Sequence, residues 1–337
     1  MKIIFIVDDN ATNLSAAENA LDNEYRVIAL SSAEQMFKAL LKFTPDLILL
    51  DVEMPEMGGF AALEQLKANQ LYKDIPVIFL TGLTDAVNEA HGIELGAVDF
   101  ITKPFSKPVL LNRLKTHLDI DELIRERTKQ LILLQNAIVS TMADLVENRD
   151  RNTGGHIERT ANYMKILIDG LLERSVYADE ISKWDLEAVI SSARLHDVGK
   201  ITISDTILNK PGKLTDEEFE IMKTHSKEGE DIIAKAIERT GDTEFLHHAK
   251  LFAAYHHERY NGRGYPYGLT GNDIPLHGRI MAIIDVYDAL VSERPYKKAF
   301  TTEEAHRIIM DERGEHFDPL ITDVFDEIIK ELPGSSS

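Results

Sequence analysis

Hydrophobic positions in residues 1–118 follow two alternating patterns. Short runs of hydrophobic residues are typical of buried strands, and hydrophobic residues at every third or fourth position are typical of amphipathic helices. Strands are predicted at Ile3–Val7, Arg26–Leu30, Asp46–Leu50, Pro76–Leu80 and Asp99–Ile101. Strands that alternate with helices in this way predict an α/β fold with a doubly wound, five-stranded parallel sheet, whose functional crevice lies at the carboxyl ends of the strands.

The pattern is helical throughout from about Asn136, which predicts an all-α second domain. Between Ser106 and Asp150 the chain has no glycine and a single proline near the start, so one long connecting helix is expected. We expect a first domain at 1–118, a connecting helix at 119–135, a second domain at 136–331 and a flexible tail at 332–337.

Hydrophobic residues in the connecting helix repeat every seven positions, at Ile124, Leu131, Ile138 and Leu145. This partial heptad has two interpretations. It forms a coiled-coil seam that joins two copies in a homodimer, or it packs the helix on its own second domain.

Composition narrows the functional classes. The net charge of −20 argues against a nucleic acid polymer as partner, because such binding relies on clustered cations. The chain has no cysteine, which excludes disulfides and thiolate metal sites. No apolar run approaches ~20 residues, and the N-terminus lacks a signal-peptide pattern, so no membrane association and a cytoplasmic location are expected.

Polar residues follow four strands of the predicted sheet. Asp8 and Asp9 follow the first strand, Asp51 the third, Thr81 the fourth and Lys103 the fifth. Clustered carboxylates favour Mg²⁺, whose preferred ligands are oxygen atoms. Such an ion would hold a phosphoryl donor beside Asp51, the expected nucleophile, with Lys103 and Thr81 close to the new phosphate.

These residues lie in motifs that together resemble the receiver domain of two-component response regulators. The motifs are Val7–Asn10, Leu50–Pro55, Met57–Gly59, Thr81–Gly82 and Lys103–Phe105. The resemblance implies that Asp51 accepts a phosphoryl group from a cognate sensor histidine kinase. It also implies a Mg²⁺ site made by Asp8, Asp9, Asp51 and Glu53, and switch residues at Thr81, Phe100 and Lys103.

The second domain carries histidines and aspartates close to helix ends. The hydrophobic residues of 186–193 predict a helix that delivers His196 and Asp197 to a buried side, with Gly199 as its left-handed C-cap. A capping box of Thr215 and Glu218 predicts the start of a helix that carries His225 on its last turn.

Further candidates follow along the chain. They are His156 at a helix start, the pair His256–His257, and Asp285, which shares a helix face with Asp288. His247 and His248 are expected to face solvent. Imidazole and carboxylate ligands without thiolates are compatible with iron, manganese, zinc or nickel.

A glycine-rich loop follows the His256–His257 pair. Gly262 and Gly264 would permit close approach of a ligand to the backbone, and Tyr260 and Tyr265 offer faces on which a base can stack. Arg294 and Lys297 lie beyond Asp285, where they would hold phosphate oxygens.

The order of these residues resembles the HD superfamily of metal phosphohydrolases, and the loop that contains Gly262, Gly264 and Tyr265 narrows the resemblance to the HD-GYP branch. That branch consists of phosphodiesterases that open cyclic di-GMP to linear pGpG and, in some members, to GMP. The resemblance therefore implies cyclic di-GMP as substrate and two divalent ions, with iron or manganese ahead of zinc and nickel.

Residue roles follow from the same resemblance. Asp197 would bridge the two ions; His156, His196 and Asp285 would serve one, and His225, His256 and His257 the other. Lys200 would act at the leaving oxygen, and Gly262, Gly264, Tyr265, Arg294 and Lys297 would contact substrate.

One position departs from part of that family. Some members hold a third ion with a glutamate four residues before the first histidine, where this chain has Asn152. An amide is a weaker, neutral ligand, so a two-ion site is expected. Two alternatives remain open: a non-catalytic receptor for cyclic di-GMP, and a phosphodiesterase for another cyclic dinucleotide such as cyclic GMP-AMP.

Overall fold

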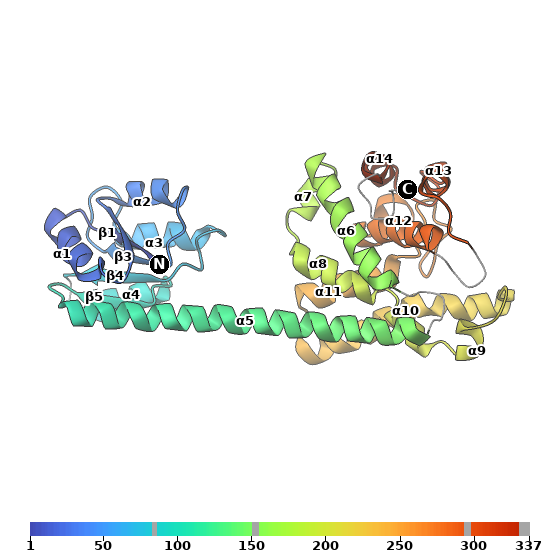
Figure 1. Ribbon diagram of the computed structural model, residues 1–337, viewed down its shortest axis with the longest axis horizontal. Helices are drawn as coiled ribbons and strands as arrows, with labels where there is room; N and C mark the ends of the chain where they lie inside the picture. The colour runs from blue at the N-terminus through green and yellow to red at the C-terminus, as the bar shows by residue number, and fades with distance from the viewer. Residues whose placement is uncertain (83–85, 150–154, 293–297, 330–337) are drawn as a thin grey trace. The chain divides into compact units, whose positions relative to one another are not determined.

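A computed structural model describes residues 1–337 apart from 83–85, 150–154, 293–297 and 330–337, with the backbone alone at 86–88. The chain forms two compact units, Met1–Leu131 and Ile132–Ser337 (Figure 1). Over the described ranges, no helix is both long enough and apolar enough to span a membrane.

The first unit is built on a parallel sheet, which confirms the predicted doubly wound fold. Its strands are β1 (Ile3–Val7), β2 (Arg26–Leu30), β3 (Leu47–Asp51), β4 (Val77–Thr81) and β5 (Asp99–Thr102), in the order β2-β1-β3-β4-β5. β3 and β4 each end one residue later than predicted. Asp51 pairs with Leu80 and Thr81 with Thr102, so both functional candidates are the last residues of their strands.

Helices cover both faces of the sheet. They are α1 (Ala11–Leu21), α2 (Ala33–Leu40), α3 (Gly59–Ala68), α4 (Ala86–Glu94) and the start of α5 (Lys107–Arg149). Successive strand residues point to opposite faces. Ile4 and Ile6 therefore pack with α1 and α5, whereas Phe5 and Val7 pack with α2 and α3. This two-sided burial fixes the register of the strand ends that carry the polar residues.

Helix α5 is the long helix expected between Ser106 and Asp150. The domain boundaries expected near 118 and 136 both fall inside it and stay predictions. The apolar residues of the partial heptad are exposed. The interpretation in which α5 packs on its own second domain is confirmed for the end of the helix, but through other residues: Val139, Ala143 and Val146 are buried there, and Val139 packs with Leu195 and Val198.

The second unit is helical, as predicted. Its elements are α6 (His156–Glu173), α7 (Ala178–Ile181), α8 (Leu186–Ser192), η1 (Ala193–Leu195), η2 (Val198–Thr202), α9 (Asp205–Leu208), α10 (Asp216–Thr240), α11 (Glu244–Tyr255), η3 (Gly271–Asp273), α12 (Leu276–Val291), α13 (Thr302–Asp311) and α14 (Pro319–Ile328). α12 is buried along most of its length and packs against α6, α11, α13 and α14 (Figure 1). A helix with so much apolar surface removed from water anchors the core of the unit.

The segment that carries His196 and Asp197 differs from the prediction. α8 ends at Ser192, and the two residues lie between the short helices η1 and η2. Gly199 is not a left-handed cap. A Cβ atom there would lie 1.9 Å from the carbonyl oxygen of His225 and 2.5 Å from the amide nitrogen of Gly229. Gly199 is therefore required for the close contact between η2 and α10.

The predicted capping box of Thr215 and Glu218 is confirmed at the start of α10. The position of His225 within that helix is corrected, because α10 continues to Thr240 and places His225 near its middle. The helix persists because the contact with η2 and α11 stabilises it beyond the histidine.

The expectation that His248 faces solvent is wrong, whereas His247 is exposed as expected. His248 is buried on α11, and its Nδ1 lies 2.7 Å from Nε2 of His277 on α12. The ring of Trp184 lies 4.3 Å from that of His277. The two imidazoles thus share one hydrogen bond inside the helical core.

We expect this pair to make the stability of the second unit pH-dependent. Burial, with His247 nearby, lowers the pKa of His248 to about 4, and burial beside His248 lowers the pKa of His277 to about 3. Asp185 opposes the shift at His248. Below about pH 6.5 the unfolded chain therefore binds protons that the folded chain does not. The free energy of unfolding is expected to fall as the pH drops from 6.5 towards 4.

Urea unfolding across that pH range, followed by the fluorescence of Trp184, measures this dependence. The double variant His248→Asn and His277→Gln keeps polar atoms near both positions and is expected to flatten the profile. His247→Gln removes an exposed imidazole and serves as the control. A wild-type profile no steeper than that of the double variant would contradict the assignment.

Candidate metal centre

Two groups of potential metal ligands lie in the second unit. One consists of His156, His196 and Asp285, and the other of Asp197, His225, His256 and His257. Within each group the ligand atoms lie within 4.8 Å of one another. The structure thus brings together all seven residues proposed from the sequence. They come from α6, the η1–η2 junction, α10, the end of α11 and α12.

Hydrogen bonds at Nδ1 define the tautomers of several of these imidazoles. Nδ1 of His196 lies 2.9 Å from the carbonyl oxygen of Ala193, and Nδ1 of His225 lies 2.7 Å from that of Met222. Nδ1 of His256 lies 2.9 Å from the carbonyl oxygen of Phe252. A carbonyl only accepts, so each Nδ1 carries the proton and each Nε2 keeps its lone pair.

These lone pairs face one another. Nε2 of His225 lies 3.3 Å from Nε2 of His256, and Nε2 of His156 lies 3.3 Å from Nε2 of His196. The unprotonated Nε2 atoms of His225 and His256 repel at this distance unless a cation lies close to both. The donor set therefore fits divalent metal ions, in agreement with the chemistry expected from the sequence.

Asp197 lies where the two groups meet. Its Oδ1 is 3.3 Å from Nε2 of His225, and its Oδ2 is 3.5 Å from Nε2 of His196. Lys200 Nζ is 2.8 Å from Oδ2. Burial would raise the pKa of Asp197, but the positive charge of Lys200 outweighs it, so the pKa lies well below its usual range. The carboxylate is therefore ionised and able to serve both groups.

The second group favours neutral imidazoles. Burial, together with His256 and His225, holds the pKa of His257 well below its usual value. Burial also lowers the pKa of His225, although Asp197 opposes the shift. Neutral imidazole is the form that binds metal.

Asp288 orients the first histidine. Its Oδ2 accepts a hydrogen bond from Nδ1 of His156 at 2.7 Å, and its Oδ1 accepts one from Nε of Arg159 at 2.6 Å. Burial would raise the pKa of Asp288, but the bonds from His156 and Arg159 lower it. The sequence placed Asp288 on the face of Asp285 but did not reveal this role, because His156 lies 132 positions away.

Asp288→Asn is expected to weaken Mn²⁺ binding by about 10- to 100-fold, because a carboxylate behind a histidine ligand raises its basicity and fixes its ring. Isothermal titration calorimetry would measure the change. Asp326→Asn is the matched control, since Asp326 accepts from His306 at 2.6 Å on the surface. Equal Mn²⁺ affinities for Asp288→Asn and wild type would show that His156 needs no such support.

The loop after His257 is held by a residue that the sequence analysis did not assign a role. The buried carboxylate of Glu258 accepts hydrogen bonds from the backbone N–H groups of Tyr267, Gly268 and Leu269, at 2.7, 3.1 and 3.0 Å. This arrangement closes the loop and presents the ring of Tyr265 at 4.7 Å from that of His257.

The loop glycines have structural roles of their own. A Cβ at Gly264 would lie 2.3 Å from the backbone nitrogen of Arg259, and Gly262 adopts a φ of 78°. Both therefore serve the tight path of the chain, and a role in substrate binding stays a prediction. Arg294, Lys297 and Asn152 lie outside the described residues.

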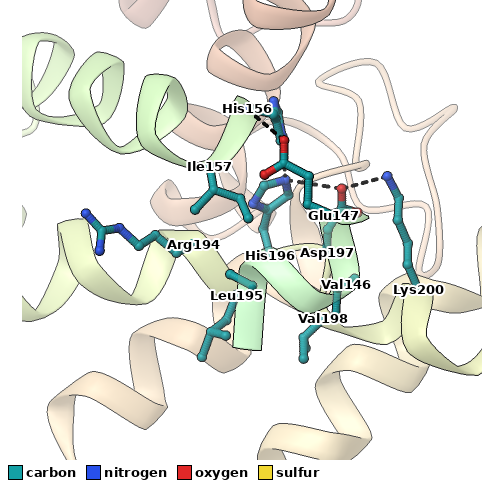
Figure 2. Close-up of a pocket in the computed structure, with 11 residues that line it drawn as sticks. Val146, Glu147, His156, Ile157, Arg194, Leu195, His196, Asp197, Val198 and Lys200 are labelled. Carbon is teal, nitrogen blue, oxygen red and sulfur yellow. Dashed lines mark hydrogen bonds and ion pairs between the residues drawn. The ribbon is translucent and has the colours of Figure 1, made fainter. Parts of the chain in front are cut away.

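A pocket opens beside the first ligand group. Its walls come from α5, α6 and the segment that carries Asp197 (Figure 2). The lining includes His156, His196, Asp197 and Lys200, and Glu147 of α5 points towards the start of α6. The pocket thus combines candidate ligands and a cation at one opening.

The first unit has its own acidic group, formed by Asp8, Asp9 and Asp51 at the carboxyl ends of β1 and β3. Lys103 Nζ lies 2.6 Å from Asp8 and 2.7 Å from Asp51. Burial raises the pKa of Asp51, although Lys103 opposes the shift. Thr81 is buried at the end of β4, next to β3.

The remaining switch candidate, Phe100, lies on β5 beside β4. The ring of Phe100 is partly buried and lies 5.2 Å from that of Phe79. The amide of Glu53 is 3.4 Å from Oδ1 of Asp51, so its peptide lies beside the candidate nucleophile.

Comparisons with known proteins identify both domains. The family model for the HD domain matches residues 134–321, and that for the response regulator receiver domain matches residues 4–115. A probable cyclic di-GMP phosphodiesterase of Vibrio cholerae is 41% identical over 337 residues, covering 96% of this chain and 76% of that protein.

Two further relatives bear on the substrate. The cyclic di-GMP phosphodiesterase response regulator RpfG of Xanthomonas campestris is 35% identical and covers 82% of this chain and 74% of that protein. A 3'3'-cGAMP-specific phosphodiesterase of Vibrio cholerae is 38% identical and covers 61% of this chain and 36% of that protein.

Proposed function

The chain belongs to the HD-domain family and carries a response regulator receiver domain, and from this premise we propose that it hydrolyses cyclic di-GMP under the control of phosphorylation at Asp51. Relatives that cover most of the chain are named for this phosphodiesterase activity. The observation that carries the proposal is the pair of ligand groups that meet at Asp197.

The HD domain implies divalent metals. His156, His196 and Asp285 would hold one ion, His225, His256 and His257 would hold the other, and Asp197 would contribute its carboxylate to both. When bound, two divalent ions supply a more acidic water and positive charge towards the phosphate oxygens. Iron or manganese is proposed for these two ions in preference to zinc or nickel. In the first unit, a separate Mg²⁺ is proposed at Asp8, Asp9, Asp51 and Glu53.

The chain's own residues supply the remaining chemistry. Lys200 neutralises Asp197 at 2.8 Å and would donate a proton to the leaving 3′-oxygen of the ribose. Asp288 holds the proton on Nδ1 of His156, so Nε2 stays directed at the ligand group. The loop of Gly262, Gly264 and Tyr265 would contact a base, and Arg294 and Lys297 would hold phosphate.

Anaerobic loading with Mn²⁺ or Fe²⁺, followed by chromatography of products from cyclic di-GMP, tests the proposal. Hydrolysis to pGpG or GMP is expected, with about two ions in the second unit because Asn152 supplies no additional charge. Cyclic GMP-AMP is the competing substrate. Tight binding without product would instead favour a non-catalytic receptor, and three well-occupied ions would contradict the two-ion assignment.

We also propose that two copies pair along α5, because its apolar residues at seven-residue spacing are exposed. Leu131→Glu combined with Ile138→Glu is expected to halve the mass measured by light scattering. Ile221→Glu, at an exposed apolar position of α10, is the control. A monomeric wild-type protein would contradict this pairing.

A further inference from the structure

The last turn of α5 contacts two segments of the proposed metal centre, the start of α6 and η2. The contacts come from Glu147 and Arg149, which are partly buried and lie two positions apart. One side chain reaches the start of α6, where His156 is located, and the other reaches η2, where Lys200 is located. All of these residues belong to the second unit.

Glu147 caps the helix that begins with His156. Its Oε1 accepts a hydrogen bond from the backbone N–H of His156 at 2.9 Å (Figure 2). The N-cap of α6 is Gly155, which has no side chain with which to satisfy the free N–H groups. A carboxylate from α5 therefore takes the place of the usual capping side chain and also complements the helix dipole.

Arg149 holds the backbone after Lys200. Its guanidinium donates to the carbonyl oxygens of Ile201 at 2.7 Å and Ile203 at 3.0 Å. It also forms an ion pair with Asp205 at 2.7 Å. Asn209 donates to the backbone carbonyl of Arg149 at 2.8 Å, which ties the end of α5 to the same segment.

We propose that Glu147 and Arg149 are positioning residues for hydrolysis, through which the end of α5 sets the placement of His156 and Lys200. The inference rests on the proposed phosphodiesterase function and deepens it by naming a regulatory connection. Glu147 acts as a hydrogen-bond acceptor and is not among the ligand groups of the described residues. Arg149 acts through a planar fork that spans two carbonyls, which a lysine ammonium cannot reproduce.

Substitutions at the two positions test this proposal with different signatures. Glu147→Ala is expected to weaken Mn²⁺ binding about 10-fold, the lower end of the effect of orienting groups around metal ligands. Glu147→Gln keeps an acceptor oxygen and is expected to recover most of that loss. Arg149→Lys and Arg149→Ala are expected to lower kcat about 10-fold at constant KM. Lys200 would be misplaced for the chemical step, whereas substrate binding would be unaffected.

Mn²⁺ affinity by calorimetry and kcat and KM for cyclic di-GMP are measured on the full chain. Glu126→Gln and Arg127→Lys are matched controls on α5, because their side chains contact Gln130 of the same helix. A loss in Glu147→Gln as large as in Glu147→Ala would overturn the acceptor role. Wild-type kcat in Arg149→Lys and Arg149→Ala would overturn the positioning role of Arg149.

The proposed function and this inference fail in different ways. A wild-type protein that binds Mn²⁺ but leaves cyclic di-GMP intact would refute the phosphodiesterase. The affinities of Glu147→Ala and Glu147→Gln for Mn²⁺ would still decide whether Glu147 positions the ligand group.

Discussion

Asp197→Asn is expected to abolish hydrolysis of cyclic di-GMP, with a loss of more than about 1000-fold in kcat/KM, because bridged divalent ions contribute several kcal/mol of transition-state stabilisation. The variant keeps the size of the side chain but removes the charge that lies between the two ligand groups. The ion pair between Lys200 and Asp197, 2.8 Å long, is also lost. Metal analysis is expected to show the loss of at least one ion.

Asp169→Asn provides the matched control, because Asp169 is an exposed carboxylate on α6. Circular dichroism of both variants separates loss of the site from loss of the fold. Full turnover by Asp197→Asn would exclude the bridging role and with it the proposed mechanism.

Asp51→Asn is expected to eliminate stable labelling of the chain by acetyl phosphate in the presence of Mg²⁺. Asp51 ends β3 beside Asp8, and Lys103 lies 2.7 Å from its carboxylate, where it would neutralise an incoming phosphoryl group. Phosphate-affinity electrophoresis measures the label. Asp22→Asn, which alters an exposed carboxylate, is expected to label as the wild type does.

A stable phosphoryl mimic at Asp51 is also expected to change the phosphodiesterase rate by at least about 5-fold, the lower end of coupling between linked sites. Asp51→Asn would show no response to the mimic. Labelling that persists in Asp51→Asn would place the phospho-acceptor elsewhere. Equal wild-type rates with and without the mimic would show that the first domain does not control hydrolysis.

The sequence was most informative where one residue type is needed at the end of a strand or helix. Asp51 and Lys103 could be placed on the same sheet edge because parallel strands present their carboxyl ends together. His196 and Asp197 could be proposed as ligands, but the path of their segment could not. The contact of Gly199 with α10 depends on packing between segments that are distant in sequence.

Long-range partners account for most of what the sequence did not reveal. His248 was expected at the surface because it lies eight positions before the ligand pair His256–His257, whereas its hydrogen-bond partner is 29 positions away. Glu147 lies nine positions before His156, too far for a local capping signal. Hydrophobic periodicity predicts which face of a helix is buried, but not which polar group that face will meet.

The contact between η2 and α10 has a consequence for how relatives are classified. Position 199 leaves no room for a side chain, since a Cβ would lie 1.9 Å from the carbonyl oxygen of His225. A relative that retains every metal ligand but has alanine or a larger residue at this position would have the segments that carry Asp197 and His225 pushed apart. Such a protein would pass a motif-based inventory of active phosphodiesterases and still be a pseudoenzyme. Position 199 should therefore be inspected together with the metal ligands when relatives are classified.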